Sequence, residues 1–216
     1  GPDSATDTAV LDLTDPTAPT IEITEDINDD ELINEDELVG DIDARVTLPV
    51  DAVAGDTVTV TDGNGNSQDI ILTTTDISNG YIDVVIANPG NNGTIVVTAN
   101  LTDIAGNVGP DSATDTAVLD LTDPGAPTVI IIDDSNDDEL INEDELTGDI
   151  NAVVSLPGNA VAGDTVTITD GNGNSQDVVL TVSDATNGFI LVVIDNPGDG
   201  GTIVVTANLT DVAGNV

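Results

Sequence analysis

The feature that most constrains this chain is an internal duplication at domain length. Residues 1–108 and 109–216 align without a gap, and the segment GPDSATDTAVLDLTDP begins at both Gly1 and Gly109. Roughly three-quarters of the aligned positions are identical, which is the signature of an array of similar domains. We therefore expect each domain to hold its own shape and to join its neighbours, instead of contributing to one shared active site.

Each repeat consists of short apolar–polar alternations separated by turn residues. In TVTVT (residues 57–61) every second residue is apolar, as in a half-buried strand, and the DGNGN that follows is typical of a tight turn. We predict an all-β fold of tandem Ig-like β-sandwich domains, about seven strands each, arranged end to end as a rod. The strands expected in the first repeat are Pro19–Thr24, Leu38–Leu48, Thr57–Thr61, Gln68–Thr74, Tyr81–Ala87, Thr94–Leu101 and Ser112–Leu121.

The repeat also predicts the domain boundaries. Two prolines stiffen the short segment Asp123–Pro127, where a linker is expected. Residues 1–14 then correspond to the last strand of a preceding repeat, 15–123 to the first Ig-like repeat, and 124–216 to a second repeat without its own last strand. Either the chain is an excerpt from a longer array, or residues 1–14 complete a neighbouring molecule, as in donor-strand polymers.

Charge restricts the partners of this chain. It has 42 acidic residues and one basic residue, Arg45, for a formal charge of −41. Such a surface excludes nucleic acid and anionic membranes, because it has no cations to replace their counterions. It also resists compaction unless a cation neutralises it. The apolar content of 38%, rich in Val and Ile, favours a folded protein over a disordered one.

Two function classes find little support in the composition. The sequence has no His, Cys or Lys, so the usual catalytic bases and nucleophiles are missing and we expect no enzyme. No segment approaches the roughly 20 apolar residues of a transmembrane helix, so direct membrane insertion is not expected. The two aromatic residues, Tyr81 and Phe189, stand at equivalent strand starts, and we expect them to pack in the core.

The strongest local signal is an acidic segment in each repeat. Residues 26–37 match the twelve-residue calcium-loop template at positions 1, 3, 5, 9 and 12, and position 7 offers a backbone carbonyl. Oxygen ligands of this kind select Ca²⁺. The predicted ligands are Asp26, Asn28, Asp30, Leu32, Asn34 and Glu37 in the first repeat, and Asp134, Asn136, Asp138, Leu140, Asn142 and Glu145 in the second.

The match to this template is imperfect in two respects. Position 6 is Glu31 in the first repeat and Glu139 in the second, where glycine usually makes the turn. The flanking segments read as strands, so the segment is not an EF-hand. The competing interpretation is a solvated acidic loop that binds no ion.

A second set of residues is expected to meet where two repeats join. In an Ig-like sandwich, the acidic loop, the turn at residues 62–66 and the linker share one end of a domain, and the turn at 211–215 faces them from the next. One Ca²⁺ at this junction would stiffen it; the alternative is ordinary turn chemistry, since Asp, Asn and Gly form turns in any case. The five candidates are Asp62, Asp120, Asp123, Asp211 and Asn215.

Several of these segments together resemble a known family. TDPTAPTIEI, the acidic segment ending in INEDEL, GDTVTVTDGNGN and TDIAGN are similar to the bacterial Ig-like extender repeats of giant RTX and biofilm-associated surface adhesins. The resemblance covers the whole chain, twice. It implies calcium-rigidified domains joined end to end at the bacterial cell surface, with calcium ligands in the acidic loop and near the linker. Ligand contact would then come from other domains of the full protein.

Three functions remain open on the sequence alone. The first is a structural spacer in an extracellular adhesin or filament, rigidified by Ca²⁺, whose partners are neighbouring repeats. The second is a non-covalent filament subunit assembled by donor-strand exchange through residues 1–14. The third is a module that itself binds a glycan or a surface.

Overall fold

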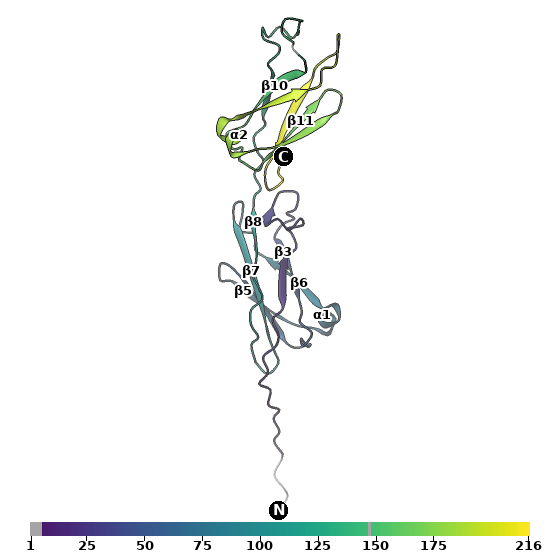
Figure 1. Ribbon diagram of the computed structural model, residues 1–216. Coiled ribbons are helices and arrows are strands. Elements are labelled where there is room, and N and C mark those ends of the chain that lie inside the picture. The colour runs from purple at the N-terminus through teal and green to yellow at the C-terminus, as the bar shows by residue number, and fades with distance from the viewer. Residues whose placement is uncertain (1–5, 147) are drawn as a thin grey trace, which may run out of the picture. The chain divides into compact units, whose positions relative to one another are not determined.

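The computed structural model describes residues 6–146 and 148–216, and these divide into two compact units. Unit 1 is Gly1–Asp120 and unit 2 is Leu121–Val216. In Figure 1, unit 1 runs from purple to teal and unit 2 from green to yellow. Each unit is described by itself below.

Unit 1 is a sandwich of two sheets. One sheet has the strand order β1-β3-β6 and the other has the order β2-β8-β7-β4-β5. All pairs are antiparallel except β2 with β8. The elements are β1 (Thr20–Ile23), β2 (Leu32–Ile33), β3 (Ile42–Thr47), β4 (Thr57–Asp62), β5 (Ser67–Ile71), α1 (Thr74–Asn79), β6 (Tyr81–Ile86), β7 (Thr94–Thr102) and β8 (Asp115–Leu119).

Alternation of side chains explains why these segments form strands. Along β7, the residues Ile95, Val97, Ala99 and Leu101 are buried, and the residues between them are half-buried. Because successive side chains of a strand point to opposite faces, this pattern gives one apolar face that must be covered. The facing sheet covers it, and residues 6–19 add no strand.

Unit 2 repeats this sandwich with fewer strands. Its sheets have the orders β13-β10-β9 and β12-β11-β14. Among the described residues of unit 2, no strand corresponds to β2 or β8. The elements are β9 (Thr128–Ile131), β10 (Ile150–Ser155), β11 (Thr165–Asp170), β12 (Ser175–Val179), α2 (Val182–Asn187), β13 (Phe189–Ile194) and β14 (Val205–Thr210).

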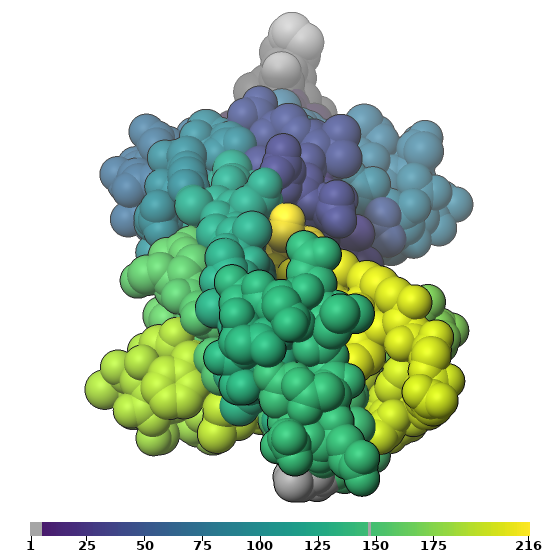
Figure 2. Space-filling model, turned by 90° about the horizontal axis from the view of Figure 1, so that it is seen from above, coloured from purple at the N-terminus to yellow at the C-terminus, as the bar shows by residue number. Residues whose placement is uncertain are grey.

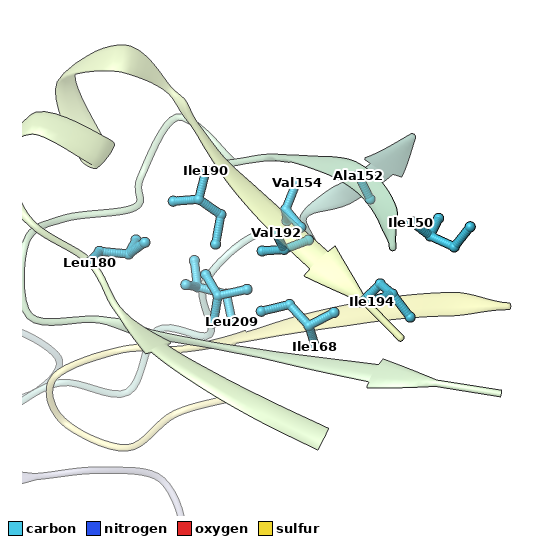
Figure 3. Packing of buried hydrophobic residues seen from close by; sticks show 10 residues of the cluster. Ile150, Ala152, Val154, Ile168, Leu180, Ile190, Val192, Ile194 and Leu209 are labelled. Carbon is cyan, nitrogen blue, oxygen red and sulfur yellow. The ribbon is translucent and has the colours of Figure 1, made fainter. Parts of the chain in front are cut away.

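The core of unit 2 is built from aliphatic side chains alone. Figure 3 shows aliphatic side chains from the two facing sheets pointing toward one another. Ile190 and Val192 come from β13, whereas Ile168 and Leu209 come from β11 and β14. Val, Ile, Leu and Ala therefore fill the core without aromatic residues. The all-β sandwich expected from the sequence is confirmed.

The expectation for the two aromatic residues was wrong. Tyr81 is half-buried on the outer face, and its ring lies under the Arg45 guanidinium, 4.0 Å from the ring centroid. Phe189 is 42% exposed. Both stand at the first position of their strand, so the pleat directs them outward, whereas Ile82 and Ile190 next to them point into the core.

Short elements of two kinds were not expected. The helix α1 lies between the expected strands Gln68–Thr74 and Tyr81–Ala87 and begins at the last residue of the first, and α2 occupies the same place in unit 2. A capping box starts α1: Thr73 Oγ1 accepts from the Asp76 N–H (3.3 Å), and the Asp76 carboxylate accepts from the Thr73 N–H (2.7 Å). Gly80 ends the helix with a φ of 80°. The other unexpected element is β2, inside the acidic segment.

Candidate metal-binding loops

The acidic segment of unit 1 lies between β1 and β3, and its first half gathers three of the predicted ligands. Asp26 Oδ1 accepts a hydrogen bond from the Asp30 N–H (3.1 Å), and Asp26 Oδ2 accepts one from the Glu31 N–H (2.9 Å). Asn28 Oδ1 accepts from the same Asp30 N–H (3.1 Å), and its amide donates to Asp30 Oδ2 (3.0 Å). Asp26, Asn28 and Asp30 therefore meet around one peptide N–H.

The backbone of this half-loop adopts the turn for which the template uses glycine. Glu31, at position 6, has a φ of 68°, and Asp29 has a φ of 58°. Unit 2 repeats this conformation at Asp137 (57°) and Glu139 (66°). A left-handed conformation costs a residue with a Cβ about 1–2 kcal/mol. The glutamate at position 6 therefore does not prevent the turn, and both units tolerate the cost at the same place.

The second half of the loop forms a separate turn. Asn34 Oδ1 accepts from the N–H groups of Asp36 (2.8 Å) and Glu37 (3.0 Å), and Glu37 Oε2 accepts from the Asn34 N–H (3.1 Å). Both Asn34 and Glu37 are buried. Between the two halves, β2 pairs with β8 through the carbonyls of Glu31 and Ile33. The Leu32 carbonyl, a predicted ligand, is outside that ladder.

The loop of unit 2 has the same first half. The Asp138 N–H donates to Asp134 Oδ1 (3.2 Å) and to Asn136 Oδ1 (3.0 Å). Glu145 Oε2 accepts from the Asn142 N–H (3.1 Å), and its Oε1 accepts from the Ser135 hydroxyl (2.9 Å). The carboxylate at position 12 therefore reaches the residue next to Asp134. The counterpart of Ser135 in unit 1 is Ile27, which has no hydroxyl to donate. Figure 2 shows this segment, in green, at the molecular surface.

The chemistry of these oxygens fits a hard cation, although the ligand set is incomplete. Seven of the twelve residues 26–37 are acidic. The side chains of Asp26, Asn28 and Asp30 all offer oxygen acceptors, and their one nitrogen group is the donor NH₂ of Asn28. Ca²⁺ takes six to eight oxygen ligands, more than one half-loop supplies. Within residues 6–146 and 148–216, no three acidic side chains form a metal-binding group.

The candidates for the junction lie in different units. In unit 1, Asp62 caps the hairpin after β4: its Oδ1 accepts from the Asn66 N–H (2.8 Å) and its Oδ2 from the Asn66 amide (2.8 Å). These bonds hold the pKa of Asp62 below its ordinary value, and the bond from the Asn66 side-chain amide has the largest effect. Asp120 directly follows β8, and its N–H donates to the Ile33 carbonyl (3.0 Å). Asp62 and Asp120 thus belong to the end of the sheet that carries the acidic segment.

The remaining candidates, Asp123, Asp211 and Asn215, belong to unit 2. Asp211 caps the turn after β14, accepting from the Asn215 N–H (2.9 Å) and from the Asn215 amide (2.9 Å). Asn215 is buried, whereas Asp123 is exposed. The carboxylates of Asp62 and Asp211 thus make the bonds that turn chemistry requires. A meeting of all five residues stays a prediction.

Two buried carboxylates were missed by the sequence analysis. Asp56, 2% exposed, accepts from the Val53 N–H through Oδ2 (2.8 Å), and Asp164 does the same with Val161 (2.8 Å). The Oδ1 atom of each is buried without a hydrogen-bond partner. A buried unpaired acceptor is costly, which makes these atoms candidates for an ion or water contact. The signal in the sequence is an Asp immediately before a period-2 strand, in the segment AGDTVT of both repeats, a place where Asp is also common in turns.

Comparison with known proteins gives likenesses of fold. No protein-family model and no curated protein matches the sequence. Among solved structures, the chain is similar to the FN1–FN3 domains of chicken CNTN1, with 12% identity, 93% of this chain and 64% of that chain covered, and a TM-score of 0.42. It is also similar to a Ca²⁺-stabilised, ice-binding adhesin of an Antarctic bacterium (24% identity, 90% and 48% covered, TM-score 0.41).

A third similar structure belongs to a 1.5-MDa bacterial ice-binding adhesin (26% identity, 90% and 63% covered, TM-score 0.36). The chain thus spans between about half and two thirds of the structures it matches. At these identities and TM-scores, the matches assign the chain to no family. Separately, none of the helices in the described residues has the length and apolar character needed to cross a membrane.

Proposed function

We propose that this chain is a structural spacer of an extracellular bacterial surface adhesin, built from Ig-like domains 15–123 and 124–216. What carries the proposal is recurrence. Both units fold as sandwiches of nearly the same sequence, and both gather an Asp-Asn-Asp set at the same place in the acidic loop. A repeated domain with a repeated loop suits a protein whose task is length and stiffness.

Calcium is the proposed source of that stiffness. In unit 1, Asp26, Asn28 and Asp30 would hold the ion, and the Leu32 carbonyl, Asn34 and Glu37 would complete its ligands. The ion would supply positive charge to a loop with seven carboxylates in a chain of charge −41. The strained residues Glu31 and Glu139 support this proposal, because strain of this kind is found at ligand-binding sites.

The test is unfolding of the full chain, and its solution length, with and without calcium. Extracellular calcium modules bind with a Kd of about 10⁻⁴ to 10⁻³ M. At a calcium concentration 100 times the Kd, each site adds about 2.7 kcal/mol to the free energy of unfolding. We expect calcium to raise the unfolding midpoint more than magnesium or sodium at equal ionic strength. Small-angle scattering should show a longer and less variable molecule.

Variants separate a bound ion from general screening of charge. Asp26→Asn with Asp30→Asn should remove the calcium response of unit 1, and Asp134→Asn with Asp138→Asn that of unit 2. Asp29→Asn with Asp36→Asn is the matched control: it removes two charges from the same loop at positions outside the predicted ligands, and Asn tolerates the positive φ of position 29. An equal loss in the control, or no calcium response in the native chain, would contradict the proposal.

One observation favours a second candidate, a surface-binding module. The outer face of the sheet β13-β10-β9 carries the cross-strand row Ile130, Val153 and Leu191, of which Ile130 is 61% and Leu191 is 68% exposed. Exposed apolar patches often mark interaction sites. The test is retention of the chain on a glycan array and on an alkyl-coated surface, compared with the double variant Val153→Arg, Leu191→Asp. Equal retention of the two proteins would exclude this face.

A further inference from the structure

The two units differ most on one face of one sheet. The strands of the three-stranded sheet, β1, β3 and β6 in unit 1 and β9, β10 and β13 in unit 2, have eight inward-facing and eight outward-facing residues. Seven of the eight inward residues are identical in the two repeats, and the exception is Ile21, which is Val129 in unit 2. Only two of the eight outward residues are identical. The repeats thus keep the core side of this sheet and change the surface that it presents.

None of the eight outward residues of β9, β10 and β13 is ionisable. We refer to them as the neutral face of unit 2. Three are polar, and the five apolar ones are Ile130, Val153, Phe189, Leu191 and Val193. At the same positions unit 1 has four charged residues, Glu22, Asp43, Arg45 and Asp83. The difference between the units therefore removes every charge from this face.

The apolar residues of the neutral face are open to solvent. Ile130 is 61% exposed, Leu191 is 68% exposed and Val193 is 56% exposed. The cross-strand pairs Ile130↔Val153 and Val153↔Leu191 join them into one row. Val85, the counterpart of Val193, is 55% exposed, so the face is open in unit 1 as well. Water thus meets a contiguous apolar surface on one side of the sheet.

The sequence of β13 is that of a strand covered on both sides. FILVVI is apolar at every position, whereas the equivalent β6, YIDVVI, has Asp83 on its outer side. Continuous apolar runs are typical of strands buried on both faces, and a polar outer side is typical of strands with one solvated face. In unit 2 the sheet β12-β11-β14 covers the inner side of β13. A layer over the neutral face would cover the other side.

Charge and shape select what that layer can be. A cationic partner finds no carboxylate on the neutral face, and an anionic partner is repelled by a chain of charge −41. A second neutral face brings no charge to the contact, so the carboxylates of both chains stay outside it. Two sheets with the same twist pack face to face about 10 Å apart, whereas a twisted sheet does not lie flat on an extended surface.

We propose that the neutral face of unit 2 packs on the neutral face of a second copy of this chain. The contact is isologous, so it closes a two-fold dimer. The acidic loop of residues 134–145 joins β9 to β10 at one end of the sheet, and opposite strand directions in the two copies place their acidic loops at opposite ends of the contact. The proposal depends neither on calcium nor on the spacer function. It assigns a different occupant to the face of the second candidate function.

The size of the neutral face predicts weak association. Strands lie about 4.8 Å apart and residues on one face lie about 6.8 Å apart along a strand, so three short strands cover roughly 300 Å². Two copies then bury roughly 600 Å², about half of the ~1,200 Å² at the lower limit of stable interfaces. Repulsion between two chains of charge −41 weakens the dimer further at low salt.

The test is sedimentation equilibrium of the full chain in the presence of a calcium chelator. Protein concentrations up to about 1 mM reach the range in which complexes with a Kd of that size form. We expect a monomer–dimer equilibrium whose Kd falls as salt is raised, because salt screens the repulsion between the chains and the contact itself holds no ion pair. The chelator excludes dimers in which calcium bridges the acidic loops.

Leu191→Asp tests the neutral face directly. It gives position 191 the residue that unit 1 has there, Asp83, and it should raise the Kd roughly 10- to 100-fold, because the contact loses a leucine and gains a charge from each copy. The matched control is Val179→Asp, which adds the same charge to β12 in the other sheet and should leave the Kd nearly unchanged. Leu191 and Val179 are 68% and 63% exposed, so neither variant threatens folding.

Three outcomes would overturn self-association through this face. The first is a native chain that stays monomeric at the highest concentration. The second is a dimer that Leu191→Asp and Val179→Asp weaken equally. The third is a monomer that an alkyl-coated surface retains and that Leu191→Asp releases, which would assign the face to the second candidate function instead. The spacer function is tested separately, by the response of unfolding to calcium, and none of these outcomes decides it.

Discussion

The two units have nearly the same sequence, but among the described residues only unit 1 has the strand β8. Their differences therefore show which features accompany that strand. With β8 present, the acidic loop contains β2, and Asn34 and Glu37 are buried. Without it, the equivalent residues form no strand, Asn142 is exposed and Glu145 is half-buried. The other sheet, the hairpin after β4 and the short helix are the same in both units. Pairing with β8 thus accompanies the burial of the second half of the acidic loop, whereas the turn that begins at Asn34 or Asn142 forms in both units.

A second difference concerns the outer face of the three-stranded sheet. Unit 1 has the cross-strand row Glu22, Arg45 and Asp83, with an ion pair between Arg45 Nε and Asp83 Oδ1 (2.8 Å). Unit 2 has aliphatic residues at these three positions. Cross-strand neighbours of this kind contribute little to stability when exposed. The replacement therefore changes the surface more than the fold.

The largest expected effect comes from replacing the same leucine in its two copies, Leu119 and Leu11. Leu119→Ala should lower the free energy of unfolding of unit 1 by about 2–5 kcal/mol, the usual loss for a buried leucine. Leu11→Ala, in the same sequence context, should leave the stability of the monomer unchanged, because Leu11 is 81% exposed. Chemical denaturation at low protein concentration measures both. Equal losses would mean that residues 7–11 belong to the core of unit 1, which contradicts the structure.

The strands could be predicted from the sequence because apolar and polar residues alternate along them in both repeats. Val58 and Val60 point inward and the threonines beside them point outward, as TVTVT indicates. The proximity of Asp26, Asn28 and Asp30 in the first half of the acidic loop was also predictable, since the template places them together by local spacing. The burial of Glu37 was not, because it depends on β8, more than seventy residues away in the chain. The helices were missed because Thr73, which caps α1, was assigned to the expected strand Gln68–Thr74.

An intermediate effect concerns one buried carboxylate of unit 1. The pKa of Glu25 is raised above 4.5, first by burial and then by the nearby charge of Asp43. In unit 2 the equivalent pair is Asp133 and Asn151, and the Asn151 N–H donates to Asp133 (2.7 Å). Asp43→Asn should therefore stabilise unit 1 at pH 7, by about a few tenths of a kcal/mol.

The pH dependence of that gain follows from the direction of the shift. A raised folded-state pKa means that unit 1 is penalised where the carboxyl is ionised, above 4.5, and not below it. The gain from Asp43→Asn should thus be present at pH 7, shrink as the pH falls toward 4.5, and be absent below it. Glu25→Gln serves as the control, since it should remove the penalty directly. A gain that persists unchanged at low pH would contradict a charge effect.

The smallest effect tests whether Asp62 is a turn cap or a ligand at a junction. Asp62 and Asp170 make the same bonds to Asn66 and Asn174, and hydrogen bonds from those amides lower the pKa of both carboxylates. A lowered pKa stabilises the fold above the ordinary value of 3.8, and the benefit is lost as the pH falls below it.

If both residues act only as turn caps, Asp62→Ala and Asp170→Ala should lower the free energy of unfolding of their own units equally at pH 7, with or without calcium. An ion bound at the junction predicts a different result, because Asp62 is in unit 1, which unit 2 follows in the chain. A larger, calcium-dependent loss for Asp62→Ala alone, measured by thermal unfolding, would assign Asp62 to a metal site and rule out a purely local role.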